Sequence, residues 1–107
     1  MFGVKVFDSE AFCGYKQITT FYTDFGIAEP FGKSAILDTY KRGLEYAKTD
    51  YKVLTEFVMV LNWKIWEHYQ NNEPLARIYN NLWQEADKYA VENLKGEELT
   101  YFFRTTD

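Results

Sequence analysis

The chain has 107 residues, of which 47% are hydrophobic and 26% are charged, and it carries a formal net charge of −4 with an isoelectric point near 5.0. A chain of this length and composition is expected to fold as one soluble domain with its own core. The negative charge disfavours direct binding to DNA or RNA, because nucleic-acid affinity depends on cations that neutralise phosphates. Aromatic residues make up 20% of the chain, which is more than a small core easily buries, so we expect some of them to face a partner.

The first eighteen residues differ in pattern from the rest of the chain. Hydrophobic side chains alternate over residues 2–7, as in a short strand or hairpin, so we treat residues 1–18 as an extension that contains a β element. No signal-peptide pattern is found, and Cys13 has no second cysteine with which to form a disulfide. These features predict a cytoplasmic protein.

Residues 19–96 are predicted to form the helical core of the single domain. Thr19 or Thr20 can cap a short helix, which Gly26 and Pro30 limit to two or three turns. Pro30 suits the first turn of a second helix, because its missing amide hydrogen would be unpaired there in any case. This second helix is expected to end near Lys48.

The most apolar run of the chain, residues 57–66, is predicted to lie in the central helix. Hydrophobic residues recur at three- and four-residue spacing over residues 53–69, and they extend around so much of the helix that it should be covered on more than one side. Thr49 and Asp50 are suited to cap its start, and the polar residues 70–72 mark its end. The uninterrupted apolar stretch is far shorter than the ~20 residues that span a membrane, which excludes a membrane helix.

A third long helix is predicted from Glu73 and Pro74 to the residues before Gly96, a suitable C-terminal cap. The segment that follows, residues 97–107, is ambiguous: residues 99–103 fit either a strand pairing with residues 4–7 or a further helical turn. We prefer the strand. The predicted fold is thus mainly α, a compact bundle of three longer helices and a short one, with a minor β-strand pairing of the chain ends.

No motif indicates catalysis, a cofactor or a metal. The positions three and four residues from His68 hold no metal ligand, and no glycine spacing matches a nucleotide-binding loop. A carboxylate pair such as Glu56 with Glu85 could meet across two helices, but solvated helix faces explain the acidic residues equally well. We therefore expect a protein that is not an enzyme.

Large aromatic residues of the central helix are the best candidates for a binding surface. Aromatic residues at helical spacing more often belong to a core, but Trp63 and Trp66 cannot both point in the direction of Leu61 and Ile65, because residues 61 and 63 lie about 200° apart around a helix. One of the two tryptophans needs a second cover, which is either the N-terminal segment or another protein chain. The predicted partner-binding residues are Trp63, Trp66, Glu67, Tyr69 and Trp83.

The blocks at residues 19–28, 38–42, 61–64, 73–77 and 96–104 carry a resemblance to a known group of proteins. They resemble small uncharacterised proteins of the phages and mobile elements of gut bacteria, and the resemblance covers residues 19–107. That group has no assigned activity, so the resemblance implies no catalytic residues. It implies a setting in which small acidic proteins often bind a host protein, including as inhibitors of defence nucleases.

These observations together predict a protein-binding accessory or modulator protein, encoded by a phage or mobile element and directed at a host defence protein. Its negative charge suits a basic partner, although the same charge can serve only to keep the protein soluble. Two alternatives are a structural homodimer with a self-complementary aromatic face, and a small enzyme or ligand binder that uses an interhelical pocket near His68. A cofactor, a nucleic acid or a membrane is not expected among the partners.

Overall fold

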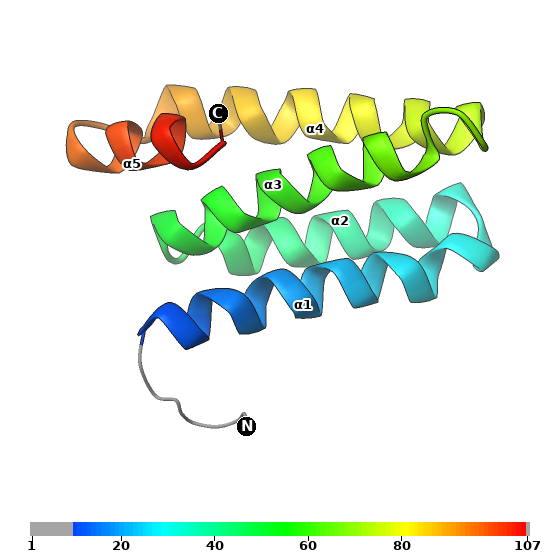
Figure 1. Ribbon diagram of the computed structural model, residues 1–107, viewed down its shortest axis with the longest axis horizontal. Coiled ribbons are helices and arrows are strands. Elements are labelled where there is room, and N and C mark those ends of the chain that lie inside the picture. The colour runs from blue at the N-terminus through cyan, green and yellow to red at the C-terminus, as the bar shows by residue number, and fades with distance from the viewer. Residues whose placement is uncertain (1–9, 107) are drawn as a thin grey trace.

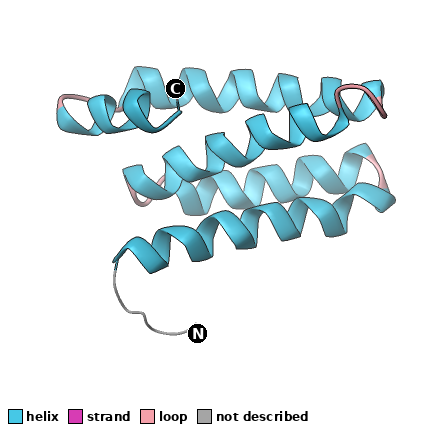
Figure 2. Cartoon of the chain, viewed as in Figure 1, coloured by secondary structure: helices cyan, strands magenta, loops and turns pink. Residues whose placement is uncertain are grey.

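The computed structural model describes residues 10–106, and the side chains of residues 18–106. The chain forms α1 (Glu10–Ala28), a short 3₁₀ helix η1 (Glu29–Phe31), α2 (Lys33–Ala47), α3 (Tyr51–His68), α4 (Glu73–Asn93) and α5 (Glu97–Thr106). The first four α-helices run alternately up and down, and α5 folds back over one end of α3 and α4 (Figure 1). Every element of regular structure among these residues is helical (Figure 2).

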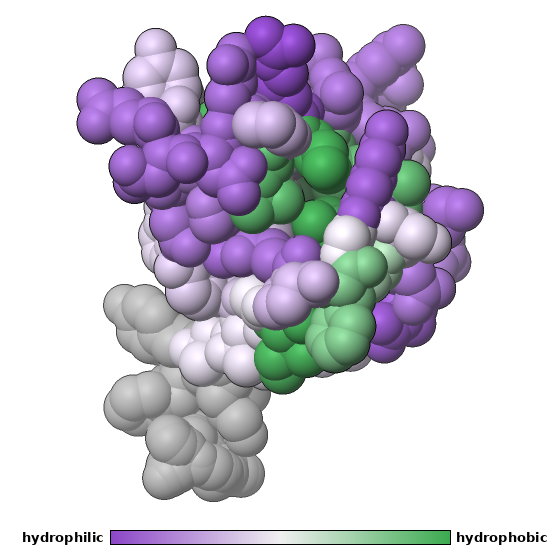
Figure 3. Space-filling view, turned by 90° about the vertical axis from the view of Figure 1, so that its right-hand side faces the viewer, coloured by the Kyte–Doolittle hydropathy of each residue, from purple (hydrophilic) through white to green (hydrophobic). Residues whose placement is uncertain are grey.

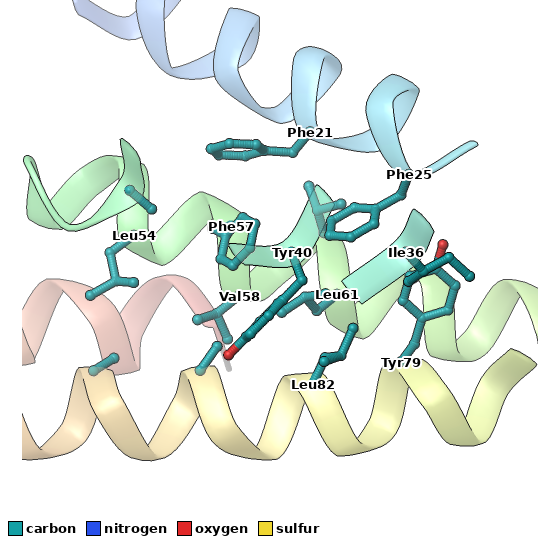
Figure 4. Packing of buried hydrophobic residues seen from close by; sticks show 14 of the residues in the cluster. Phe21, Phe25, Ile36, Tyr40, Leu54, Phe57, Val58, Leu61, Tyr79 and Leu82 are labelled. Atoms are coloured by element: carbon teal, nitrogen blue, oxygen red, sulfur yellow. The ribbon is translucent and has the colours of Figure 1, made fainter. Parts of the chain in front are cut away.

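The central position predicted for residues 57–66 is confirmed, because α3 contacts all four of the other α-helices. Phe57 lies in the middle of the core, where its ring packs edge-on against Phe21 of α1 at 4.9 Å and tilted against Tyr40 of α2 at 5.6 Å (Figure 4). One turn further along α1, Phe25 meets Tyr79 of α4 edge-on at 5.5 Å. Aromatic rings from four helices therefore build one continuous core around α3.

Local sequence signals set the ends of the central and fourth helices. The Asp50 side chain accepts a hydrogen bond from the Lys52 amide at 2.8 Å, which confirms the predicted cap of α3. At the start of α4, the Asn72 side chain accepts one from the Leu75 amide. Gly96 has a φ of 57°, the left-handed region that suits glycine, and it lies in the turn between α4 and α5.

The predicted strand at residues 99–103 is wrong, because these residues lie within α5. Leu99 and Phe102 are three residues apart and so share one face of α5, with Phe102 fully buried and Leu99 packed against the core. The Thr100 amide donates to the Gly96 carbonyl at 3.0 Å, so a glycine turn followed by two glutamates starts a helix rather than a strand. The partner strand predicted at residues 4–7 lies outside the described residues.

The first helix is also longer than predicted. Thr19 and Thr20 lie inside α1 rather than at its cap, because the helix already includes Glu10 and ends only at Ala28. Phe21, Phe25 and Ala28 form its buried side. Their spacing of four and three residues places them on one face of the helix. The bundle therefore has four long helices and one short α-helix. None of the helices described is both long enough and apolar enough to cross a membrane.

Candidate protein-binding surface

Three large aromatic side chains from the second half of α3 remain exposed. Trp63, Trp66 and Tyr69 have exposed fractions of 44%, 64% and 58%, respectively. Trp63 and Trp66 are neighbours on one side of the helix, and the rings of Trp66 and Tyr69 are in contact with centroids 5.5 Å apart. We refer to Trp63, Trp66 and Tyr69 as the aromatic face.

The arrangement of the other helices explains why this face is uncovered. α5 covers the first half of α3, where Tyr101 meets Tyr51 edge-on at 5.4 Å and lies 5.9 Å from the Lys52 ammonium. Within the described part of the chain, the backbone of α1 does not approach that of α4 or α5 closely, and α1 reaches α4 through the ring contact of Phe25 with Tyr79. Beyond α5, no other described helix covers the side of α3 that carries Trp63, Trp66 and Tyr69, as their exposed fractions show.

A groove between α3 and α4 adjoins the aromatic face. Its volume is about 500 Å³, within the range of ligand-binding clefts, and Tyr69 belongs both to the groove and to the aromatic face. Ala76 is buried beneath the groove, and Glu73 and Arg77 are the charged residues that line it. The complete lining consists of Ile65, Tyr69, Glu73, Ala76, Arg77 and Asn80.

The end of the bundle that carries η1 and the α3–α4 turn is partly hydrophobic (Figure 3). Green hydrophobic areas lie there among hydrophilic residues, and the exposed side chains of Ile27 in α1 and Phe31 in η1 belong to this end. Both of them line a smaller hollow of about 230 Å³ between α1, η1 and α2. The sequence analysis did not identify this hollow, because its residues come from three different elements that only the tertiary structure brings together.

Two further residues predicted for partner binding lie elsewhere. Trp83 of α4 is half-buried and packs against the hydrophobic core. Glu67 is exposed one turn after Trp63, but its carboxylate belongs to a partly buried ion cluster with Lys64 and His68. The structure therefore groups Trp63, Trp66 and Tyr69 in one surface and separates them from Trp83.

Glu29 lies at the centre of that ion cluster. Its Oε2 atom is 2.8 Å from the Lys64 ammonium and 3.1 Å from His68 Nε2, and it accepts a 2.6 Å hydrogen bond from the Tyr79 hydroxyl. The ring of His68 stacks on that of Tyr79 with their planes 8° apart. These contacts join η1, α3 and α4 at one end of the bundle.

Glu67 forms the second half of the cluster. Its Oε2 atom lies 3.3 Å from the Lys64 ammonium and 3.5 Å from His68 Nε2, and its Oε1 atom accepts a hydrogen bond from the Tyr22 hydroxyl of α1. The same ammonium lies 4.3 Å from the centre of the Tyr22 ring, a cation–π distance. The buried Lys64 ammonium is thus shared by two carboxylates and an aromatic ring.

The cluster shifts the pKa values of its members. Burial alone would raise the pKa of Glu29, but hydrogen bonds from Lys64, Tyr79 and His68 lower it below the ordinary value. Burial likewise opposes the lowered pKa of Glu67, and the hydrogen bond from Tyr22 and the charge of Lys64 outweigh it. Both carboxylates are therefore ionised at neutral pH.

The cluster also contains a set of atoms suited to hold a metal ion. Glu29, Glu67 and His68 each offer a ligand atom, and these atoms lie within 4.8 Å of one another. However, the Lys64 ammonium already bonds the same oxygen of each carboxylate and supplies the positive charge that a metal would supply. The residues thus form a charge-compensated link between helices, and they do not fit a metal site while Lys64 is present.

Sequence reasoning did not identify this cluster, because its members are distant along the chain. Tyr22 and Glu67 are 45 residues apart, and Glu29 and Tyr79 are 50 apart. The available signal was a lysine within the most apolar run of the chain. A charged residue at such a position in a buried helix needs a partner from another helix.

The carboxylate pair that the sequence suggested, Glu56 with Glu85, is not brought together. Glu56 is buried on α3, with 8% of its surface exposed, while Glu85 is exposed on α4. Burial, and to a lesser extent the charge of Asp50, raises the pKa of Glu56 to about 8. Its Oε1 atom has no hydrogen-bond partner within residues 18–106. Cys13 lies outside the side chains that the structure describes.

Comparisons with known proteins add no assignment to this geometry. No protein-family model matches the sequence, and neither a curated protein nor a solved structure shows significant similarity to it.

Proposed function

We propose that this protein is a protein-binding accessory protein and that the aromatic face of α3 is its docking site. The observation that carries the proposal is the group of three adjoining aromatic side chains left exposed on the most central helix. Tryptophan and tyrosine are enriched in interfaces and among the residues that contribute most to binding energy. A helix packed on several sides presents them with little loss of conformational entropy on binding.

The groove beside the face supports the same proposal. Well-packed pockets next to aromatic anchors are typical of the centre of a protein interface, where water is excluded most completely. Tyr69 connects the groove to Trp66, so one partner segment can contact both. Within this class, we propose a modulator encoded by a mobile element, such as an inhibitor of a host defence protein, and this finer statement rests on the resemblance of residues 19–107.

An affinity capture with matched variants tests the docking site. The wild-type protein, Trp66→Ala and Trp63→Ala are immobilised and incubated with lysate of the cells that encode the protein. Phe103→Ala is the control, because Phe103 of α5 has the same 44% exposure as Trp63 but lies outside the aromatic face. We expect a stoichiometric partner that the wild type and the control retain and that both tryptophan variants lose.

Circular dichroism of each variant must first show unchanged helicity, so that a lost partner is not the result of unfolding. If both tryptophan variants capture the same proteins as the control, the aromatic face is not the docking site.

An enzyme or ligand binder centred on His68 has less support. His68 does lie beside two carboxylates, as that alternative required. However, both carboxylates are shared with the Lys64 ammonium, and the α3–α4 groove is lined by other residues. A group held in this way is better suited to join helices than to exchange protons with a substrate.

A further inference from the structure

We infer that the aromatic face and the α3–α4 groove bind a second copy of this chain, forming a two-fold symmetric dimer. The inference rests on the proposed function, because it names an occupant for the same surface. A two-fold interface requires a patch that is complementary to itself, with each residue pair occurring twice. A projecting tryptophan beside a groove supplies the shape for such a pairing. One acidic and one basic residue of the groove supply the charge.

The shape provides a projecting group and a hollow on one surface. Trp66 is the most exposed residue of the aromatic face, and the groove of about 500 Å³ begins at its neighbour Tyr69. When two copies face each other, each offers a tryptophan and each offers a groove. An unrelated partner would have to match this combination, whereas a second copy carries it already.

The charges of the groove are arranged so that two antiparallel copies match. Glu73 and Arg77 are the charged residues of the groove, they form a 2.6 Å ion pair, and both are well exposed. They are four residues apart on α4, about 6 Å along its axis. If two α4 helices lie antiparallel about an axis level with Leu75, Glu73 of each copy faces Arg77 of the other. The groove itself carries one charge of each sign, so the chain's net charge of −4 is not concentrated at the contact.

The chain has enough total surface for an interface of standard size. A standard interface buries about 800 Å² on each partner, and the accessible surface of the chain is 6601 Å². The dimer would cover a hydrophobic surface that otherwise favours aggregation. It would also compete with any other protein for the aromatic face, so that self-association regulates docking.

Charge reversal tests the inference by sedimentation velocity over a range of protein concentrations. We expect a dimer for the wild type, and at least a tenfold weaker association for Glu73→Lys and for Arg77→Glu alone, since each change places like charges opposite one another. An equimolar mixture of these two variants should associate again, because in the mixed dimer both facing pairs have opposite signs.

The matched control reverses another exposed pair of the same spacing, Asp38 and Arg42 on α2, which are 3.0 Å apart. Asp38→Lys and Arg42→Glu should leave the association unchanged. A wild type that is monomeric at all concentrations overturns the inference, as does a dimer that the groove variants do not weaken or that their mixture does not restore.

The two proposals can fail separately. If the wild type is monomeric but Trp66→Ala loses its captured partner, the docking site stands and the dimer is rejected. If Trp66→Ala changes neither capture nor association, both proposals are rejected.

Discussion

Lys64 is the residue on which one end of the bundle depends. Only 1% of its surface is exposed, and its ammonium lies between Glu29 and Glu67. Removing one partner of a buried ion pair leaves the other charges without compensation in a poorly solvated site, which costs far more than a surface pair contributes. The cluster is therefore expected to stabilise this end of the bundle.

Replacing Lys64 by methionine, which has a similar length, tests this statement. We expect the free energy of unfolding to fall by about 1–3 kcal/mol, because the half-buried Glu29 and the more exposed Glu67 lose their shared buried cation. Urea unfolding monitored by circular dichroism measures the change. Lys88→Met on the exposed side of α4 is the control and should change stability by less than about 0.5 kcal/mol. A loss of less than about 1 kcal/mol for Lys64→Met would mean that the cluster contributes little.

At the scale of elements, α2 approaches α3 closely at Gly43. A methyl group built on Gly43 would lie 2.6 Å from the Phe57 ring, closer than carbon atoms pack. Phe57 cannot move aside readily, because Phe21, Phe25 and Tyr40 surround its ring. The glycine therefore has a packing role that outweighs its unfavourable effect on the α2 helix.

Alanine substitutions at two helical glycines should have opposite effects. Gly43→Ala is expected to lower the free energy of unfolding by about 1–3 kcal/mol through overpacking against Phe57. Gly26→Ala in α1 meets no atom within 4 Å, so the gain in helix propensity should stabilise the protein by about 0.5–1 kcal/mol. Thermal unfolding of the two variants and the wild type checks both signs. Equal effects of the two substitutions would show that α2 and α3 do not pack as closely as described.

At the scale of the whole molecule, three carboxylates with opposite pKa shifts set the dependence of stability on pH. Glu29 and Glu67 have lowered pKa values, so their contribution is present above the ordinary carboxyl pKa of 4.5 and is lost as the pH falls. Glu56 has a pKa raised to about 8, so the unfolded chain releases this proton more readily and stability falls as the pH rises from about 4.5 to about 8. The two effects together place maximum stability on the acid side of neutrality.

We predict that Glu56→Gln removes the decline at higher pH. In the wild type, this one group lowers the free energy of unfolding by up to about 1.4 kcal/mol per pH unit between pH 5 and 8. The glutamine amide cannot ionise, so the variant does not lose this contribution. The difference in free energy of unfolding between the variant and the wild type should therefore grow in favour of the variant as the pH rises. Urea unfolding at several pH values measures the difference. Parallel pH profiles for the two proteins would show that Glu56 is ionised in the folded state.

Much of the architecture could be predicted from sequence because it depends on neighbouring residues. Asp50 and the polar residues 70–72 define the limits of α3, and the hydrophobic spacing of α3 and α4 repeats over several turns. The wrong strand at residues 99–103 arose from a short aromatic segment that fits both periods. Tertiary packing decides whether such a segment is a helix or a strand. Here, burying Phe102 against the core requires the helix.

The aromatic face and the ion cluster around Lys64 also differ in how far they could be predicted from the sequence. That one of Trp63 and Trp66 needs a cover beyond the core follows from helix geometry alone, but that both remain exposed follows from α5 covering only the first half of α3. The hydrophobic pattern of the chain by itself determined that the fold is mainly helical and which helix is central, because these properties depend on spacing within a few turns. Only the tertiary structure decided that Glu29, Lys64 and Tyr79 meet, because electrostatic compensation of a buried charge is a contact between helices that are far apart in sequence.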